Sequence, residues 1–169
     1  MDISIIILNY QSKGFTLNCV RSIQEADFGK LEKEIIVVDN NSGDHVGEIL
    51  SWQYPEVEFI QNQTNAGMGR GNNTGLKRAR GDYLAIMNPD TIAFPDTFLK
   101  LYNFMERNKD VGVAGPRQLN PDRSVQNSCY RWHSLLTPLY RRTKLGRMPF
   151  ARPGLDKFLM KDFDHQTER

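Results

Sequence analysis

Residues 34–43 read EIIVVDNNSG, and this stretch decides the fold that the sequence predicts. Four consecutive β-branched apolar residues are typical of a strand that is buried on both faces of a parallel sheet. The apolar run stops at Asp39, and the residues after it favour a turn and the start of a helix. The stretch therefore predicts a central strand whose carboxyl end carries polar side chains.

The same pattern recurs on both sides of this stretch. Residues 3–8 (ISIIIL) form an apolar run that is followed by NYQ, and residues 83–87 (YLAIM) form another that is followed by NPD. Residues 57–60 and 111–114 predict two shorter strands. Apolar residues spaced about one turn apart predict intervening helices: Leu17, Val20 and Ile23 mark the first, and Phe94, Phe98, Leu101 and Met105, with Pro95 in the first turn, mark the last. Strands that alternate with helices indicate an α/β fold with a mostly parallel sheet flanked by helices.

Polar clusters follow three of the predicted strands, at residues 9–11, 39–42 and 88–90. Parallel strands end at one edge of a sheet, and open α/β sheets bind ligands at that edge. Taken singly, each cluster has a structural alternative: Asp39 is a good helix cap, and Asn-Pro-Asp is a good turn. The convergence of three loops on one edge favours a binding site.

Two carboxylates at this edge suggest specific chemistry. Asp39 can accept a hydrogen bond from the ring N–H of a uracil or thymine base, or from a ribose hydroxyl. Asp90, with Asn88 two residues before it, can hold Mg²⁺ or Mn²⁺ that bridges a diphosphate, because these ions prefer hard oxygen ligands.

Residues 65–75 (NAGMGRGNNTG) contain glycines at positions 67, 69, 71 and 75. Glycine inside a helix costs roughly 1 kcal/mol relative to alanine, so this segment is predicted to be a turn that a ligand or the sheet approaches closely. Both explanations stay open. A dinucleotide fingerprint should follow the first strand, whereas these glycines follow the third, and the Gly-Lys-Ser/Thr of a phosphate loop is missing.

The composition is that of a soluble globular protein, with 39% hydrophobic and 25% charged residues in a chain of 169. No apolar run approaches the roughly 20 residues of a transmembrane helix, and the start of the chain does not resemble a signal peptide. Cys19 and Cys129 lie far apart and are expected to be reduced thiols, which favours the cytoplasm. No Ser-His-acid set indicates a hydrolase.

Charge is unevenly distributed. Residues 130–161 contain eight basic residues against Asp156 alone, whereas residues 1–129 are slightly acidic. The basic segment predicts contact with a polyanion, such as the inner face of the cell membrane or a diphosphate; a solvated surface loop is the alternative. Residues 137–154 are rich in proline, glycine and arginine and predict a mobile loop. We expect a binding domain at 1–129 and a basic, partly mobile segment at 130–169.

Four motifs, in order, resemble glycosyltransferase family 2, and most strongly its bacterial rhamnosyltransferase-like branch. They are IIILNY (5–10), IVVDNNS (36–42), NAG with GNNTG (65–75) and MNPDT (87–91), and the likeness spans about residues 1–120. It implies a glycosyltransferase A-type (Rossmann-like) fold and an inverting transfer from a UDP- or dTDP-sugar to a glycan or lipid-linked acceptor in bacterial surface polysaccharide synthesis. Nucleic acid is not an expected partner.

The resemblance also implies roles for individual residues. Asn9 and Tyr10 line the base pocket, and Asp39 contacts the pyrimidine. Asn41, two residues further on, is also expected to contact the donor. The Asn65 segment lies near the sugar and diphosphate. Asn88 and Asp90 occupy the Asp-x-Asp positions, with Asp90 as the Mg²⁺ or Mn²⁺ ligand. The complete set of expected donor-binding residues is Asn9, Tyr10, Asp39, Asn41, Asn65, Gly67, Gly71, Asn72 and Asn88.

The family's general base, a carboxylate in a Glu-Asp motif within an acceptor-binding region, has no match after Asp90. Asp162 and Asp164 are acidic but lack the surrounding pattern. We therefore expect a chain that is truncated at its C-terminus and acts as the donor-binding half of an enzyme. A non-catalytic glycosyltransferase-like binding module is the main alternative, and a nucleotidyltransferase is a weaker one.

Overall fold

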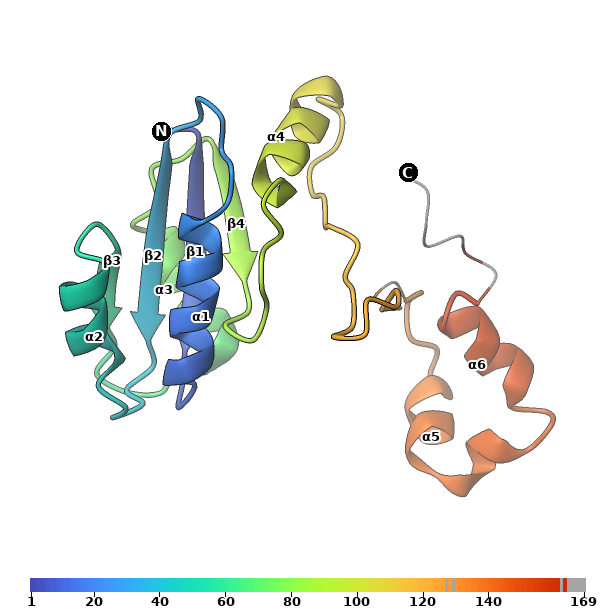
Figure 1. Cartoon of the computed structure of the whole chain (residues 1–169). Coiled ribbons are helices and arrows are strands. Elements are labelled where there is room, and N and C mark those ends of the chain that lie inside the picture. The colour runs from blue at the N-terminus through green and yellow to red at the C-terminus, as the bar shows by residue number, and fades with distance from the viewer. Residues whose placement is uncertain (127, 129, 162, 164–169) are drawn as a thin grey trace. The chain divides into compact units, whose positions relative to one another are not determined.

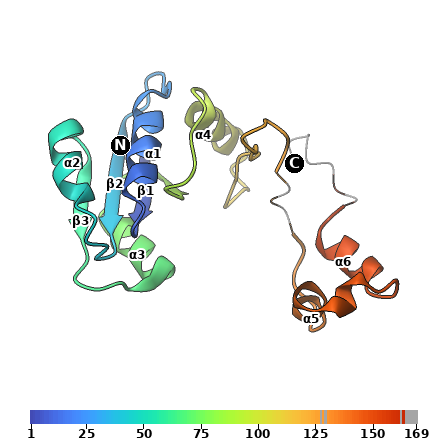
Figure 2. The same cartoon turned by 60° about the horizontal axis from the view of Figure 1, so that its bottom comes forward.

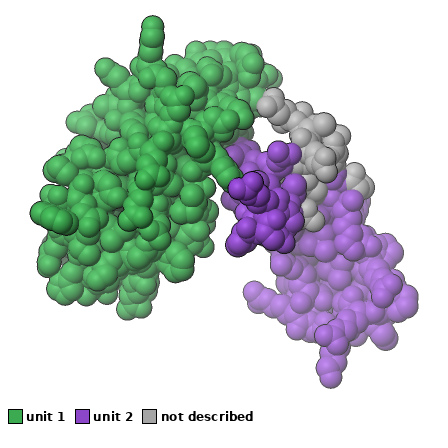
Figure 3. All heavy atoms as spheres, viewed as in Figure 1, with its two compact units in different colours: residues 1–114 green, residues 115–169 purple. Residues whose placement is uncertain are grey.

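The structure is a computed structural model that describes residues 1–126, 128, 130–161 and 163. Its contacts divide the chain into two compact units, residues 1–114 and residues 115–169 (Figure 3). Cys129, Asp162 and Asp164 lie outside the described residues, so the expectations about them stay predictions.

Unit 1 is an α/β domain in which strands and helices alternate (Figure 1). Its elements are β1 (Ile3–Asn9), α1 (Lys13–Gln24), β2 (Lys33–Asp39), α2 (Val46–Gln53), β3 (Glu58–Gln61), α3 (Gly67–Leu76), β4 (Tyr83–Met87) and α4 (Thr97–Arg107). The four strands form one parallel sheet in the order β3-β2-β1-β4. The predicted fold class is confirmed.

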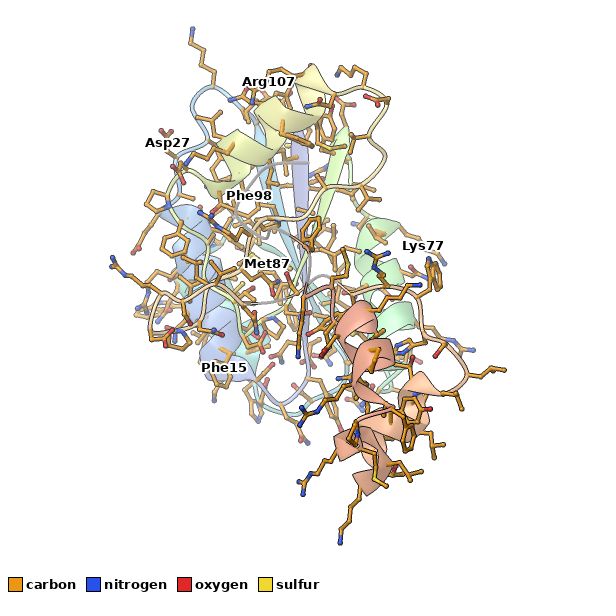
Figure 4. The ribbon with its side chains drawn as sticks, turned by 90° about the vertical axis from the view of Figure 1, so that its right-hand side faces the viewer. Phe15, Asp27, Lys77, Met87, Phe98 and Arg107 are labelled. Carbon is orange, nitrogen blue, oxygen red and sulfur yellow. The ribbon has the colours of Figure 1, made fainter. Side chains whose placement is uncertain are left out.

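One face of the sheet carries the main core. Ile5 and Ile7 of β1 and Val37 of β2 pack in a cluster with α1, α2 and α4 (Figures 1 and 2). Phe98 of α4 stacks on Phe28 with 5.0 Å between the ring centroids. Met87 at the end of β4 packs against the same cluster, within the body of unit 1 (Figure 4). Helix α4 starts at Thr97, so the prediction that Phe94 and Pro95 belong to this helix is wrong. Phe94 precedes the helix and is exposed.

Helix α3 covers the opposite face, and its glycines explain how. The predicted glycine-rich turn is wrong from Gly67 onward, where the chain is helical. A Cβ atom at Gly75 would lie 2.6 Å from Ile6 Cγ2 and 3.1 Å from Val38 Cγ2, and one at Gly71 would meet Leu8. These glycines therefore allow the helix to lie directly on β1 and β2. The close approach offsets the low helix propensity of glycine.

Replacing Gly75 with alanine is expected to destabilise unit 1 by about 1–3 kcal/mol, because the added methyl group overpacks this contact. Gly69 is the matched control, since it lies on the same helix and a Cβ there meets nothing within 4 Å. Gly69→Ala should be neutral or stabilising by up to about 1 kcal/mol. Urea unfolding followed by circular dichroism measures both. Equal effects at the two positions would contradict the packing explanation.

Beyond α3, the outer part of this face is open on β4, where Leu84 and Ile86 are exposed. The strand predicted at 111–114 is not formed among the described residues, which is a correction to the sequence prediction. A Cβ atom at Gly112 would meet nothing within 4 Å, and Val113 is 90% exposed. Without packing partners, the apolar composition of this short segment does not stabilise a strand.

A buried carboxylate joins the amino ends of the strands. Glu34 of β2 accepts hydrogen bonds from Ser4 Oγ (2.5 Å), from Arg80 N (2.7 Å) and from the Arg80 guanidinium. Burial alone raises the pKa of Glu34, but these hydrogen bonds and the Arg80 charge together hold the pKa below its ordinary value of 4.5. The ionised form therefore stabilises the fold.

Because the pKa of Glu34 is lowered in the folded state, its stabilisation is complete above pH 4.5 and is lost as the pH falls below that value. Glu34→Gln is expected to lower the free energy of unfolding by roughly 1–3 kcal/mol at pH 7 and by clearly less at pH 3. Urea midpoints of both proteins at the two pH values measure this. Asp96→Asn is the control: its ion pair with Lys100 is exposed, so its effect on the midpoint should be small throughout. A Glu34→Gln effect that is independent of pH would contradict the assignment.

Unit 2 contains helices where the sequence predicted an irregular loop. They are α5 (Thr137–Arg142), the 3₁₀ helix η1 (Lys144–Arg147) and α6 (Arg152–Phe158). The misleading residues are Pro138 and Pro153, which occupy the first turns of α5 and α6, where a missing N–H costs nothing. Phe158 stacks on Tyr130 and His133 and so organises the unit. Across the part of the chain that the structure describes, every helix is too short or too polar to cross a bilayer.

Candidate functional site

The carboxyl ends of the parallel strands meet an open cavity of about 380 Å³ in unit 1. Among the predicted site residues, Tyr10, Asn72, Asn88 and Asp90 lie on its wall. They come from the loop after β1, from α3 and from the loop after β4. Two of the three predicted loops therefore meet at this cavity, whereas residues 39–42 after β2 are not part of its lining. The full lining is Leu8, Tyr10, Ser12, Phe15, Met68, Asn72, Met87, Asn88, Pro89 and Asp90.

Asp39 ends β2 and is only 2% exposed. Its Oδ1 accepts hydrogen bonds from Asn9 Nδ2 (2.6 Å) and Ser42 Oγ (2.5 Å). Its Oδ2 accepts hydrogen bonds from Ser42 N (3.0 Å) and Gln61 Nε2 (2.7 Å). Burial raises the pKa of Asp39, but these hydrogen bonds outweigh it and hold the pKa below its ordinary value. Asp39 is therefore a buried, ionised carboxylate at the binding edge.

The alternative role of Asp39 as the cap of the next helix is wrong. Helix α2 begins at Val46, and its first N–H donates to Asp44 Oδ1 instead (3.1 Å). Asp39 closes the tight turn after β2 through Ser42. Asn41 lies in that turn with a left-handed backbone (φ 59°) and is exposed. Asparagine tolerates this conformation better than most residues do.

Asn9 is completely buried and joins the two loops. Its Nδ2 lies within hydrogen-bond distance of Asp39 Oδ1 and Asp44 Oδ2, and its Oδ1 accepts from Ser12 Oγ (3.0 Å) and Thr16 Oγ1 (2.7 Å). An amide with all its groups engaged in this way has no free position for a ligand. Asn9 therefore orients Asp39 from behind, whereas its neighbour Tyr10 is 45% exposed on the cavity wall.

The segment that leads into α3 is held by asparagines. Asn40 is 1% exposed, and its Nδ2 donates to Asn65 Oδ1 and to Gly67 O, both at 3.2 Å. Asn62 Nδ2 donates back to Asn40 Oδ1 (2.8 Å). Asn65 Oδ1 also accepts from the backbone N–H of Gly67, whose φ of +77° requires glycine. Asn65 and Gly67 thus shape the loop, and Gly71 packs against the sheet.

Asp90 lies exposed on the cavity wall, within the turn in which Thr91 N donates to Asn88 O (3.2 Å). Among the described residues, its carboxylate has no hydrogen bond or ion pair. The thiol of Cys19 lies behind this loop: burial, reinforced by the charge of Asp90, raises the pKa of Cys19 to about 12, so Cys19 stays a thiol.

These groups fit a divalent cation only when a ligand contributes to its coordination. No cluster of three or more His, Cys, Asp or Glu side chains that could hold a metal occurs in the described parts of the chain. A single free carboxylate beside the Asn88 amide supplies at most three protein oxygens. Mg²⁺ and Mn²⁺ accept such sites when phosphate oxygens and water complete the shell.

The sequence prediction missed several residues of this site. Phe15, at the start of α1, and Met68, in α3, are both 61% exposed and give the cavity apolar walls (Figure 4 labels Phe15). Gln61 contacts Asp39 from the neighbouring strand. An exposed phenylalanine or methionine next to a polar strand end is a usable signal. The pairing of Gln61 with Asp39 is not visible in the sequence.

Residues 4–164 match the family model described as Glycosyl transferase family 2. The chain belongs to glycosyl transferase family 2. Among its family relatives, the poly(ribitol-phosphate) beta-glucosyltransferase of Bacillus spizizenii is 30% identical over 136 residues, which cover 78% of this chain and 21% of that protein. The poly(ribitol-phosphate) beta-N-acetylglucosaminyltransferase TarS of Staphylococcus aureus MW2 is 27% identical, over 86% of this chain and 28% of TarS.

Solved structures of two glycosyltransferases share the fold. The crystal structure of S. aureus TarS 1–349 in complex with UDP-GlcNAc matches with a TM-score of 0.59 at 27% identity, over 64% of this chain and 32% of that one. A Pyrobaculum calidifontis mannosyltransferase, solved with GDP-Man and Mn²⁺, matches with a TM-score of 0.56 at 20% identity, which supports the fold alone. The family 2 chain described here thus spans about a fifth to a third of these relatives' lengths.

Proposed function

We propose that this chain is the donor-binding part of an inverting glycosyltransferase that uses a UDP- or dTDP-sugar. The observation that carries the proposal is the arrangement at the carboxyl edge of the sheet. There, a buried ionised carboxylate, Asp39, and a carboxylate without a partner among the described residues, Asp90, lie at the ends of different strands in a family 2 domain. The bound UDP-GlcNAc of the TarS structure supports a uridine nucleotide as the donor class.

In this proposal the two carboxylates recognise different parts of the donor, the base and the diphosphate. Asp39 accepts the ring N–H of the pyrimidine, and Tyr10, which is exposed on the cavity wall, offers a ring on which the base can stack. Asp90, with the Asn88 amide, holds Mg²⁺ or Mn²⁺ against the diphosphate, where the cation neutralises charge on the leaving group. The amino end of α3 faces the same edge, and its dipole favours phosphate there. Asn72 of α3 lies on the cavity wall and is proposed as a further diphosphate or sugar contact.

The acceptor is proposed to be a glycan or a lipid-linked sugar in bacterial surface polysaccharide synthesis. Two relatives act on poly(ribitol-phosphate), as their names state, which supports a surface polymer. A general base must deprotonate the acceptor hydroxyl for in-line attack. None of the described residues is assigned to that role. The likeness to the rhamnosyltransferase-like branch stays a prediction.

The proposal is tested by thermal shift with a panel of UDP-, dTDP-, GDP- and CDP-sugars, each with and without Mn²⁺. A nucleotide-sugar that binds only the folded state, at a concentration of a hundred times its Kd, stabilises that state by about 2.7 kcal/mol and raises the Tm by several degrees. We expect the UDP or dTDP series to give this shift and Mn²⁺ to enlarge it. The absence of any shift in a folded sample would contradict the proposal, and binding without transfer by the full-length protein would favour a non-catalytic module.

We also propose peripheral contact of unit 2 with an anionic membrane on the cytoplasmic side. Trp132 and Leu135 are 98% and 99% exposed, although the neighbouring His133 is held against Phe158. Exposed basic residues accompany them, namely Arg141, Arg142, Lys144 and Arg147. A tryptophan and leucines beside a basic surface match the chemistry of an anionic bilayer interface.

Replacing Arg141, Arg142 and Arg147 together with glutamine is expected to weaken binding to vesicles rich in anionic lipid at least tenfold, since each basic residue near the surface contributes about 1 kcal/mol. Vesicle sedimentation measures the change. The control variant neutralises three exposed basic residues of unit 1, Lys30, Lys77 and Arg107, and should bind like the wild type. Equal binding by all three proteins would contradict the membrane contact and favour the alternative, that the basic segment is a solvated surface.

A further inference from the structure

The four lone pairs of the Asp39 carboxylate are all in use. A carboxylate offers about four acceptor positions, and Asp39 receives four hydrogen bonds: from Asn9, from Gln61, and from both the hydroxyl and the backbone N–H of Ser42. A base that donates its ring N–H to Asp39 must therefore displace one of these donors. The identity of the displaced donor follows from how firmly each is held.

Three of the four donors are held in place by other parts of the fold. Asn9 is completely buried and is fixed from its other side by Ser12 and Thr16. The backbone N–H of Ser42 belongs to the turn that ends β2. The hydroxyl of Ser42 also lies 3.1 Å from Asn9 Nδ2, within the same network. Displacing any of them would break other hydrogen bonds at the same time.

Gln61 differs from the other donors. It ends β3, an edge strand of the sheet, and its side chain is exposed. Its Nε2 has one further acceptor, the backbone oxygen of the adjacent residue Asn62, at 3.2 Å. This second bond is local and does not tie Gln61 to another part of the fold. A rotation of this side chain into solvent breaks the hydrogen bond to Asp39 Oδ2 (2.7 Å) and the longer one to Asn62 O, and it leaves the other donors to Asp39 in place.

We propose that Gln61 is a displaceable placeholder: its amide occupies the position on Asp39 Oδ2 that the pyrimidine N–H takes when the donor binds. This inference rests on the proposed function. Gln61 fills the fourth acceptor position of the buried carboxylate when the site is empty, so that no lone pair of Asp39 is left without a donor. The base then exchanges one N–H donor for another on the same oxygen, and the affinity gained from that contact is reduced by the bond that is given up.

The placeholder also sharpens the choice of base. Uracil and thymine carry a ring N–H at position 3, which can replace the Gln61 donor. Cytosine has an unprotonated nitrogen there, so it offers a lone pair to a carboxylate and cannot displace Gln61. A uracil methylated at N3 has a methyl group there and no N–H to donate. With or without Gln61, either base would therefore place a group without an N–H at position 3 against Asp39 Oδ2.

The proposal is tested by calorimetric titration of the wild type and Gln61→Ala with UDP, N3-methyl-UDP and CDP. We expect Gln61→Ala to bind UDP about threefold to tenfold more tightly, since a competing hydrogen bond is removed. Its affinity for N3-methyl-UDP and CDP should stay as weak as in the wild type. Gln63→Ala is the matched control, because Gln63 is an exposed glutamine on the same loop and is not among the donors to Asp39; its affinities should equal those of the wild type.

The outcomes separate this inference from the proposed function. If the wild type fails to bind UDP, or binds UDP and N3-methyl-UDP equally, the proposed contact of Asp39 with the base is wrong. If the wild type discriminates but Gln61→Ala binds UDP equally or more weakly, the placeholder alone is wrong. A second readout avoids the variant: the side-chain amide signal of Gln61 in NMR spectra of the wild type should move on addition of UDP and stay in place with CDP, and an unmoved signal at saturating UDP would overturn the proposal.

Discussion

Asp39→Asn is expected to weaken UDP binding roughly tenfold to a hundredfold, because hydrogen bonds to a charged acceptor contribute about 1.5–3 kcal/mol. The substitution also turns an NH₂ group toward donors that Asp39 now satisfies, among them Ser42 N. A buried donor without an acceptor costs about 1–3 kcal/mol, so the variant should also unfold at a lower temperature. Calorimetric titration with UDP, well below the Tm of the variant, measures the loss of affinity.

The neighbouring carboxylate provides the control that separates binding from stability. Asp44 also accepts from Asn9 Nδ2 (3.0 Å) and from Lys13 N (3.1 Å), so Asp44→Asn disturbs the same network. Gln61 donates to Asp39 and not to Asp44, so the position proposed for the base lies on Asp39 alone. Asp44→Asn should therefore lose stability and retain its affinity for UDP. If folded Asp39→Asn binds UDP as tightly as Asp44→Asn does, Asp39 has no role in recognising the base.

Asp90→Asn is expected to remove the metal-dependent part of UDP binding, and the expected loss is roughly tenfold to a hundredfold in the presence of Mn²⁺. Asp90 is exposed and free of partners among the described residues, so the substitution should leave the stability of the fold within about 0.5 kcal/mol. Titration of UDP with Mn²⁺ and with EDTA measures the difference. In EDTA the variant and the wild type should bind UDP alike.

The reverse change at the adjacent position strengthens this test. Asn88→Asp adds a second carboxylate to the cavity wall and restores two acidic ligands two residues apart. It should therefore increase the gain in UDP affinity that Mn²⁺ produces. A Mn²⁺ response that survives Asp90→Asn and is unaffected by Asn88→Asp would place the cation elsewhere or exclude it from donor binding.

Much of unit 1 could be predicted from local patterns. Apolar β-branched runs such as residues 35–38 predict buried strands because few other structures bury every residue in succession. The prediction failed where local propensity and tertiary contact disagree. The glycines of α3 predicted a turn, but Gly75 is needed in the helix because the chain packs closely on Ile6. The prolines of unit 2 predicted a loop, but two of them lie in the first turns of helices.

Local sequence pattern was enough to predict the class of fold and the edge of the sheet that carries the candidate site. Both depend on short-range order: strands end where polar residues begin, and parallel strands end together. Only the tertiary structure decided what each polar residue does there. Asn9 and Tyr10 are adjacent, yet one is buried behind Asp39 and the other is exposed on the cavity wall. Asp39 gains its donors from Asn9 and Gln61, which lie 30 and 22 residues away. Those pairings depend on which strands lie side by side, and no local pattern encodes them.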